Sequence, residues 1–184
     1  MRVITGTAKG RRLKELKGNE TRPTTDRVKE GLFNIIPFDI EGRKVLDLFA
    51  GTGQLGIEAL SRGAASAVFV EQRRDAAALI RDNLKLTGLE ANTKVVTGEV
   101  LAFLSSCREE FDIILLDPPY ATDLLKNAVI SISQFDILSN HGIMICESSV
   151  EWDAPPVEQP YSFYRSYRYG KTKLTLIRRE EDAE

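Results

Sequence analysis

From residue 44 onward, short apolar runs alternate with segments of helical periodicity. The apolar runs are "KVLDLF" (44–49), "SAVFVE" (66–71), "TKVVTG" (93–98), "FDIILL" (111–116) and "GIMICES" (142–148), and helices are predicted between them at 54–63, 73–88, 100–107 and 124–133. Strands this apolar are usually buried on both faces, as in a parallel sheet covered by helices. The alternation therefore predicts an α/β fold of the Rossmann-like kind, with helices on both faces.

The two ends of the chain depart from this alternation. After a proline-rich loop, residues 162–168 and 171–179 flank "YG" and predict an antiparallel hairpin, which brings the mostly parallel sheet to seven strands. Residues 2–16 predict a small N-terminal β-hairpin, an appendage placed within 1–20 of a single domain spanning 1–184. Between them, the stripe of Val28, Leu32 and Ile35 predicts a helix that Thr24 or Thr25 caps and Pro37 ends.

Composition excludes several classes of protein. No apolar run approaches the ~18 residues that a membrane span needs, and the first residues lack the pattern of a signal peptide. The two cysteines, Cys107 and Cys146, lie inside apolar segments without metal-ligand spacing. We therefore expect a cytoplasmic protein with no metal and no membrane partner.

Charge is segregated along the chain. Residues 1–29 hold nine Lys/Arg against three acids, and residues 159–179 hold six Lys/Arg and no acid, although the formal net charge of the whole chain is −2. Two basic ends around an acidic body favour an anionic polymer as partner, because Lys/Arg release counterions from phosphates.

A glycine-rich turn follows the first of the apolar runs. Gly51, Gly53 and Gly56 fit G-x-G-x-x-G between a strand and a helix, and Glu71 ends the second strand about where an acid accepts hydrogen bonds from ribose hydroxyls. This pattern indicates an adenosine-containing cofactor, either NAD or S-adenosylmethionine. Asp47 slightly favours the second, because a carboxylate there can face the cationic amine of the methionine part.

Two residues after the third strand are candidates for the adenine end of such a cofactor. The Glu99 carboxylate could accept a hydrogen bond from the adenine amino group, or could be only a helix N-terminal acid favoured by the macrodipole. Val100 could line the adenine pocket or pack in the core.

The tetrapeptide "DPPY" (117–120) ends the fourth apolar run, where two prolines cannot continue a strand. A ring-attached amino group is a poor nucleophile, and two acceptors aimed at its N–H bonds favour a more tetrahedral nitrogen. The Asp117 carboxylate and the Pro118 carbonyl, held by the Pro118-Pro119 pair, can be these acceptors, and Tyr120 can stack on the base. Ligands bind at the carboxyl ends of strands in such sheets, which places "DPPY" beside the glycine turn.

With these motifs, the chain resembles class I S-adenosylmethionine-dependent methyltransferases, and more narrowly the RsmD family of bacterial 16S rRNA guanine-N2 methyltransferases. The resemblance covers nearly the whole chain and rests on "RVITGTAKGRRL", "RPTTDRVKEGLFNII", "VLDLFAGTGQLGIEALSRGA", "FVEQ", "DPPY" and "YGKTKLTL". It implies methylation of one guanine 2-amino group in the small ribosomal subunit or its precursor, by a protein expected to be a monomer.

The candidate residues follow from the motifs and the resemblance together. Those for the cofactor, S-adenosylmethionine, are Asp47, Phe49, Gly51, Thr52, Gly53, Glu71, Gln72, Glu99 and Val100, and those for catalysis are Asp117, Pro118, Pro119 and Tyr120. Glu99 stands where many relatives carry Asp. The candidate RNA-binding residues are Arg11, Arg12, Arg22, Arg27, Arg165 and Arg168. Arg27 could instead meet the cofactor carboxylate.

Other functions remain open from the sequence. DNA adenine-N6 and protein glutamine methyltransferases use related tetrapeptides, although 184 residues leave no separate DNA-recognition domain and the glutamine enzymes typically begin the tetrapeptide with Asn. An NAD-dependent oxidoreductase or a non-catalytic nucleotide-binding module belongs to a different class. No obvious set of hydride-transfer residues supports the oxidoreductase.

Overall fold

A computed structural model describes residues 1–16, 25–120 and 122–181. Its strands are β1 (Lys44–Leu48), β2 (Ser66–Glu71), β3 (Thr93–Thr97), β4 (Phe111–Leu116), β5 (Leu138–Ser149), β6 (Tyr161–Tyr169) and β7 (Thr172–Arg179). Its helices are α1 (Asp26–Asn34), α2 (Gln54–Ser61), α3 (Arg74–Thr87), α4 (Val100–Ser106) and α5 (Leu124–Phe135). Every strand and helix predicted from residue 25 onward is present, with ends that shift by a few residues.

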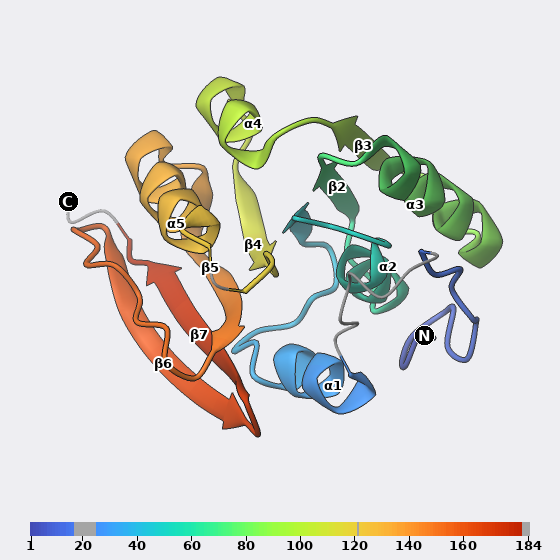
Figure 1. Cartoon of the computed structure of the whole chain (residues 1–184), viewed down its shortest axis with the longest axis horizontal. Coiled ribbons are helices and arrows are strands. Elements are labelled where there is room, and N and C mark those ends of the chain that lie inside the picture. Colours follow the sequence, from blue (N-terminus) through green and yellow to red (C-terminus); the bar gives the residue numbers. More distant parts are fainter. Residues whose placement is uncertain (17–24, 121, 182–184) are drawn as a thin grey trace.

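The seven strands form one sheet in the order β3-β2-β1-β4-β5-β7-β6 (Figure 1). Strands β1 to β5 are parallel, β7 pairs antiparallel with β5, and β6 pairs antiparallel with β7. The predicted Rossmann-like fold with its C-terminal hairpin is confirmed. Because β1 lies beside β4 rather than β3, the order reverses between them, and this is the point where such sheets bind ligands.

Two apolar cores lie on the two faces of the sheet. Neighbouring residues of one strand, such as Val45 and Leu46, point into different cores, as the two-residue period of a strand requires. Helices α1, α2 and α3 cover one core, and α4 and α5 cover the other (Figure 1). Strands buried on both faces explain why the apolar runs were nearly continuous in the sequence.

The N-terminal strap (residues 1–16) packs on α2 and α3. It folds back on itself as predicted, but only one antiparallel bridge forms, between Arg2 and Arg12, rather than a ladder of strand pairs. Some of its other backbone groups bond within the strap, such as the Gly10 N–H to the Val3 carbonyl oxygen, and others bond to the body. The Glu58 carboxylate accepts from the N–H groups of Ile4 and Thr5, at 2.8 and 3.0 Å, and the strap is therefore anchored by a buried acid of α2.

A buried lysine completes this anchor. Lys29 of α1 is fully buried, its ammonium donates to the carbonyl oxygen of Arg2, and its Nζ lies 3.7 Å from Glu58 Oε2. Burial lowers the pKa of Lys29, and the neighbouring Glu58 opposes this shift. Arg62 also donates to Glu58, at 3.0 Å. Helix α1, helix α2 and the strap thus share one charged contact inside the protein.

Helix α1 contacts the C-terminal hairpin on another side. The Thr25 side chain caps its first turn by accepting from the Val28 N–H, as one of the two predicted caps. At Gly31, a Cβ atom would lie 2.6 Å from Cζ of Tyr169, at the end of β6. A side chain at this position would therefore need the Tyr169 ring to move.

Candidate active site

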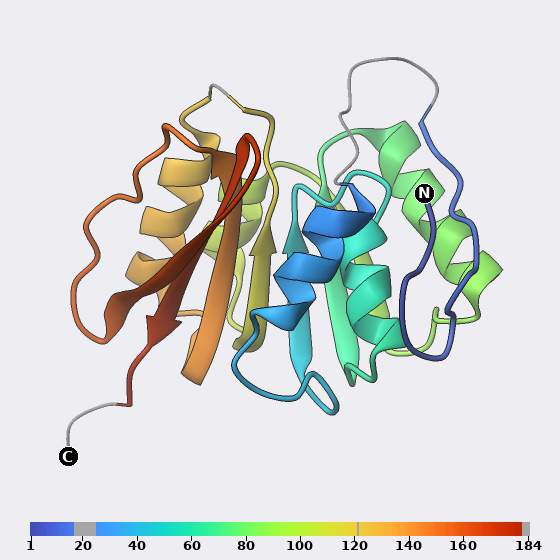
Figure 2. The same cartoon turned by 90° about the horizontal axis from the view of Figure 1, so that it is seen from below.

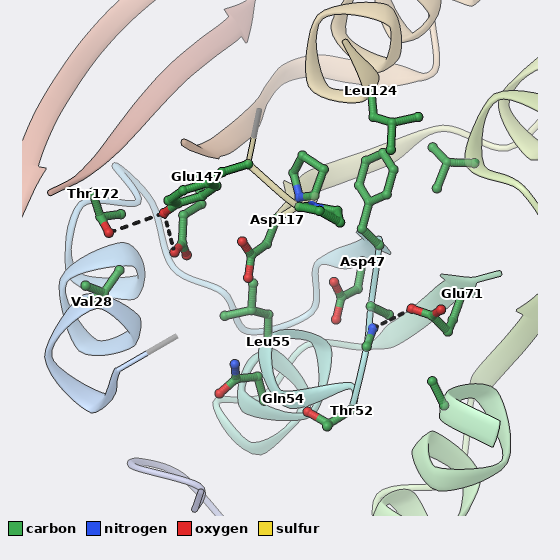
Figure 3. A pocket seen from close by; sticks show the side chains of 18 of the residues that line it. Val28, Asp47, Thr52, Gln54, Leu55, Glu71, Asp117, Leu124, Glu147 and Thr172 are labelled. Carbon is green, nitrogen blue, oxygen red and sulfur yellow. Dashed lines mark hydrogen bonds between the residues drawn. The ribbon is translucent and has the colours of Figure 1, made fainter. Parts of the chain in front are cut away.

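A cavity of about 980 Å³ opens at the carboxyl ends of the parallel strands (Figure 3). It brings together most of the predicted residues. Those that line it are Asp47, Phe49, Gly51, Thr52, Glu71, Gln72, Glu99, Val100, Asp117, Pro118, Pro119 and Tyr120. The glycine turn and "DPPY" therefore face one common space.

The chain turns sharply after β1 to form the floor of this cavity. Phe49, Gly51 and Gly53 all have positive φ, of 60°, 57° and 79°, and a positive φ is unusual for a phenylalanine. Gly53 does not belong to the lining residues and instead precedes α2 as its N-cap. At Gly56, a Cβ would lie 2.3 Å from the Phe69 ring, so this glycine lets α2 pack closely on β2.

Two carboxylates at the ends of β1 and β2 are held by backbone N–H groups. Glu71 accepts from Gly51 and Arg73, both at 2.8 Å, and is 8% exposed. Asp47 accepts from Gly56 at 2.9 Å and is 1% exposed. Burial raises the pKa of Asp47 well above its usual range, against the opposing hydrogen bond from Gly56. A cation bound near Asp47 would favour the ionised carboxylate of this residue. The negative charge of that carboxylate would in turn stabilise the cation.

No role is predicted for Gln54 from the sequence, but the structure places it at the first turn of α2 and in the cavity lining. Its Oε1 atom is buried and has no hydrogen-bond partner among the described residues. A buried acceptor without a donor costs free energy, roughly 1–3 kcal/mol. The cavity is therefore suited to a ligand that carries a hydrogen-bond donor. Figure 3 shows Gln54 below Asp47 and Asp117.

The glycine turn is also fixed from outside by Asn83, a fully buried residue of α3 that sequence reasoning missed. Its amide nitrogen donates to the carbonyl oxygens of Thr52 and Lys14, at 3.0 and 3.1 Å. Its amide oxygen accepts from the Lys14 N–H at 2.8 Å. Asn83 therefore ties the N-terminal strap to the glycine turn. Its partners are distant in sequence, so these contacts could not be predicted from the residues around Asn83.

The "DPPY" corner meets two residues from other strands. The Tyr120 hydroxyl donates to Glu147 Oε1 of β5 and shares a hydrogen bond with Thr172 Oγ1 of β7, both at 3.3 Å (Figure 3). Glu147 and Thr172 also line the cavity, and the sequence analysis assigned neither. The sequence could have indicated Glu147 as a site residue through its position near the carboxyl end of the strand beside β4.

The far wall of the cavity comes from the first turn of α1 and from the turn of the C-terminal hairpin. The lining residues there are Thr25, Arg27, Val28, Tyr169, Gly170, Lys171 and Thr172. Figure 2 shows that the β6–β7 turn lies at the same end of the sheet as the start of α1. Of the predicted arginines that the structure describes, only Arg27 is part of this wall, where its exposed side chain can meet cofactor or RNA.

The other predicted arginines lie elsewhere. Arg165 and Arg168 are exposed on the edge strand β6, outside the cavity. Arg11 and Arg12 are exposed on the strap, also outside it, and Arg22 falls outside the described residues. Contact of these arginines with RNA stays a prediction.

Two absences hold for the described parts of the chain. Within residues 1–16, 25–120 and 122–181, no three His, Cys, Asp or Glu side chains gather as a metal site. None of the helices in these ranges has the length and apolarity needed to cross a bilayer.

The strand order, the antiparallel β7 and the cavity at the switch point define this fold as that of a class I methyltransferase. A solved structure with the same fold is the Escherichia coli protein yhhF, with a TM-score of 0.87, 34% identity and coverage of 98% of each chain. The family described as "Conserved hypothetical protein 95" matches residues 1–178, and the chain belongs to this family.

Curated relatives agree with this assignment. "Ribosomal RNA small subunit methyltransferase D" of Escherichia coli (strain K12) is 35% identical over 184 residues, which cover 100% of this chain and 92% of the relative. YlbH of Bacillus subtilis (strain 168) is 37% identical, over 97% of this chain and 99% of the relative. The resemblance to the RsmD family, inferred from the motifs, is confirmed.

Proposed function

We propose that this protein methylates the exocyclic 2-amino group of one guanine in 16S rRNA, with S-adenosylmethionine as methyl donor. The substrate is the small ribosomal subunit or an assembly intermediate, and the enzyme acts in the cytoplasm as a monomer. The observation that carries the proposal is that the glycine turn and the Asp117-Pro118 corner line one cavity. The name of the Escherichia coli relative, which specifies small-subunit rRNA, supports the choice of substrate.

The cavity fits S-adenosylmethionine by the chemistry of its groups. Glu71 and the turn at Gly51 would hold the ribose, and Glu99 with Val100 would hold the adenine. Asp47 and the unpartnered Gln54 Oε1 offer acceptors to the cationic amine of the methionine part, a group that NAD lacks. When bound, the cofactor supplies a methyl group made electrophilic by its cationic sulfur.

The protein's own part in the reaction is to orient the amine and stabilise charge. The Asp117 carboxylate accepts one N–H bond of the 2-amino group, and the Pro118 carbonyl accepts the other. Asp117 is half-buried and Pro118 is buried, so both acceptors are partly shielded from water. As the nitrogen becomes positive, the Asp117 carboxylate stabilises it, and the methylated amine then releases its surplus proton to solvent. Tyr120 stacks on the base and fixes its plane.

The RNA is bound by cations around the cavity mouth. Arg27 and Lys171 lie in the cavity wall, and Arg165 and Arg168 extend the positive charge along β6. The Arg165 guanidinium lies 5.2 Å from the centre of the Tyr164 ring, and Arg178 lies 4.9 Å from the same ring. Arginines paired with aromatic rings suit phosphates and unstacked bases together.

The test uses labelled S-adenosylmethionine and small subunits from a strain that lacks this enzyme. We expect label in 16S rRNA, recovered as N2-methylguanosine after digestion to nucleosides. Asp117→Ala should lose at least 100-fold in rate while keeping its affinity for S-adenosylhomocysteine. Label in N6-methyladenosine would indicate the wrong base, and no label with folded protein would refute the proposal. Calorimetry with NAD and S-adenosylmethionine separates the oxidoreductase alternative.

A further inference from the structure

The cavity holds a second carboxylate beside Asp117 that the proposed chemistry leaves without a role. In the register of β4 and β5, Leu116 lies opposite Cys146, so Asp117 and Glu147 follow at the same level on neighbouring strands. Such strands lie about 4.8 Å apart, and side chains at the same level point to the same face. Figure 3 shows both carboxylates side by side, directed into the same part of the cavity.

Glu147 is also held in place. It is 6% exposed, it accepts from the Tyr120 hydroxyl at 3.3 Å, and that hydroxyl is bonded in turn to Thr172. Burial raises the pKa of Tyr120, so its hydroxyl keeps the proton that it donates. The residue proposed to stack on the base is thereby tied to the carboxylate beside it. A base in contact with Asp117 and Tyr120 would therefore lie close to Glu147.

The position in the sheet assigns this carboxylate to the base rather than the cofactor. The predicted cofactor residues belong to the ends of β1, β2 and β3, on one side of β4. Glu147 and Thr172 belong to β5 and β7, on the other side of β4. Asp117, at the end of β4, lies between the two groups. The groups beyond Asp117 therefore face the substrate.

Resting on the proposed function, we propose that Glu147 determines the choice of base, by accepting the N1–H of guanine while Asp117 accepts its 2-amino group. Guanine presents these two donors next to each other on its Watson–Crick edge, and two neighbouring carboxylates match them. Adenine presents an acceptor at N1 beside its amino group. A buried carboxylate facing that lone pair repels it and loses its own hydrogen bond, so adenine is rejected.

The decisive substrate is 2,6-diaminopurine, which keeps the 2-amino group but has an unprotonated N1. Once nucleoside mapping has located the methylated guanine, 16S rRNA with diaminopurine at that position is prepared by ligation and reconstituted into small subunits. Methyl transfer is then measured for guanine and diaminopurine subunits with wild-type enzyme, Glu147→Gln and Thr172→Val. We expect the wild type to prefer guanine by roughly 10- to 100-fold.

In Glu147→Gln the amide keeps the size of the side chain and can still accept from Tyr120, but its NH₂ can donate to an unprotonated N1. The preference for guanine should then fall to about threefold or less. Thr172→Val removes the other partner of the Tyr120 hydroxyl and should slow both substrates equally, with the preference unchanged. A purely structural role for Glu147 would give that same result.

The two failures are distinguishable. If the wild type methylates guanine subunits but Glu147→Gln keeps the full preference, the assignment of Glu147 is wrong and the proposed function stands. If the wild type prefers neither base, Glu147 is likewise not the determinant. If the wild type leaves the guanine subunits unmethylated, the proposed function fails and this inference fails with it.

Discussion

The two basic ends of the chain carry similar charge but stand in different relations to the cavity. The turn of the C-terminal hairpin lines the cavity, and Lys171 belongs to its wall. The turn of the N-terminal strap instead packs on Ser61, at the last residue of α2, whereas the glycine turn lies at the first residues of that helix. Equal charge therefore does not imply equal function: the hairpin turn forms part of the site, whereas the strap turn braces α2, although Met1, Leu16 and Arg27 of the N-terminal end line the cavity.

The largest expected effect comes from breaking the brace. Lys29→Met removes the ammonium that bonds the strap and pairs with Glu58, and leaves two buried acceptors with one donor fewer. We expect the free energy of unfolding to fall by about 3–5 kcal/mol, measured by urea denaturation. Lys9→Met, at an exposed strap position, is the matched control and should change it little. A loss below 1 kcal/mol for Lys29→Met would mean that the pair does not hold the strap.

Two glycines of the strap allow the stability effect of close packing to be separated from that of backbone conformation. Gly6 and Gly10 have similar φ values, 85° and 82°, but a Cβ at Gly6 would lie 1.7 Å from the Ser61 carbonyl oxygen, whereas at Gly10 it meets nothing within 4 Å. Gly10→Ala should therefore lower stability by about 1–2 kcal/mol through backbone strain alone. Gly6→Ala should cost roughly 1–3 kcal/mol more. Equal losses in thermal unfolding would show that the strap does not press on α2.

A smaller effect is expected when arginines of the C-terminal hairpin and of the N-terminal strap are compared in binding to small subunits. The double variant Arg165→Ala with Arg168→Ala should raise KM about tenfold. It should also reduce the magnitude of the slope of log binding constant against log salt concentration by about 2, one for each lost phosphate contact. The matched pair, Arg11→Ala with Arg12→Ala, should raise KM less than about threefold, because the strap turn lies at the far end of α2. A larger effect from the strap pair would reverse the roles of the two ends.

The smallest effect concerns the cavity floor, which neither set of arginines lines. The pKa of Asp47 is raised in the free protein, and the cationic amine of S-adenosylhomocysteine favours its ionised form. Binding should therefore release a proton, and affinity should rise with pH from the ordinary carboxyl range upward, by at most about tenfold per pH unit. Calorimetry in buffers of different ionisation enthalpy measures the release.

Two variants serve as test and control for this proton release. Asp47→Asn should abolish the proton release, and the strap pair should leave it unchanged. Proton uptake, or a release that persists in Asp47→Asn, would contradict this assignment.

Local pattern predicted most of the fold and part of the site. The apolar runs, the glycines after β1 and the prolines of "DPPY" each act through their own neighbours in sequence, so their structural consequences could be predicted. The contacts of Lys29, Asn83, Glu147 and Thr172 depend on partners from distant segments. A buried lysine on a helix has no local signature that separates it from an exposed one. At the N-terminus a single bridge forms, between Arg2 and Arg12, and the backbone N–H groups of Ile4, Thr5 and Thr7 donate to residues of α2.

The crossing of Gly31 and Tyr169 has an evolutionary consequence. Helix α1 carries the start of the cavity wall, holds the strap through Lys29 and leaves no room for a side chain where it meets the hairpin. A lineage that acquires alanine at position 31 must move or shrink the aromatic ring at position 169. We therefore expect these two positions, far apart along the gene, to change together or not at all.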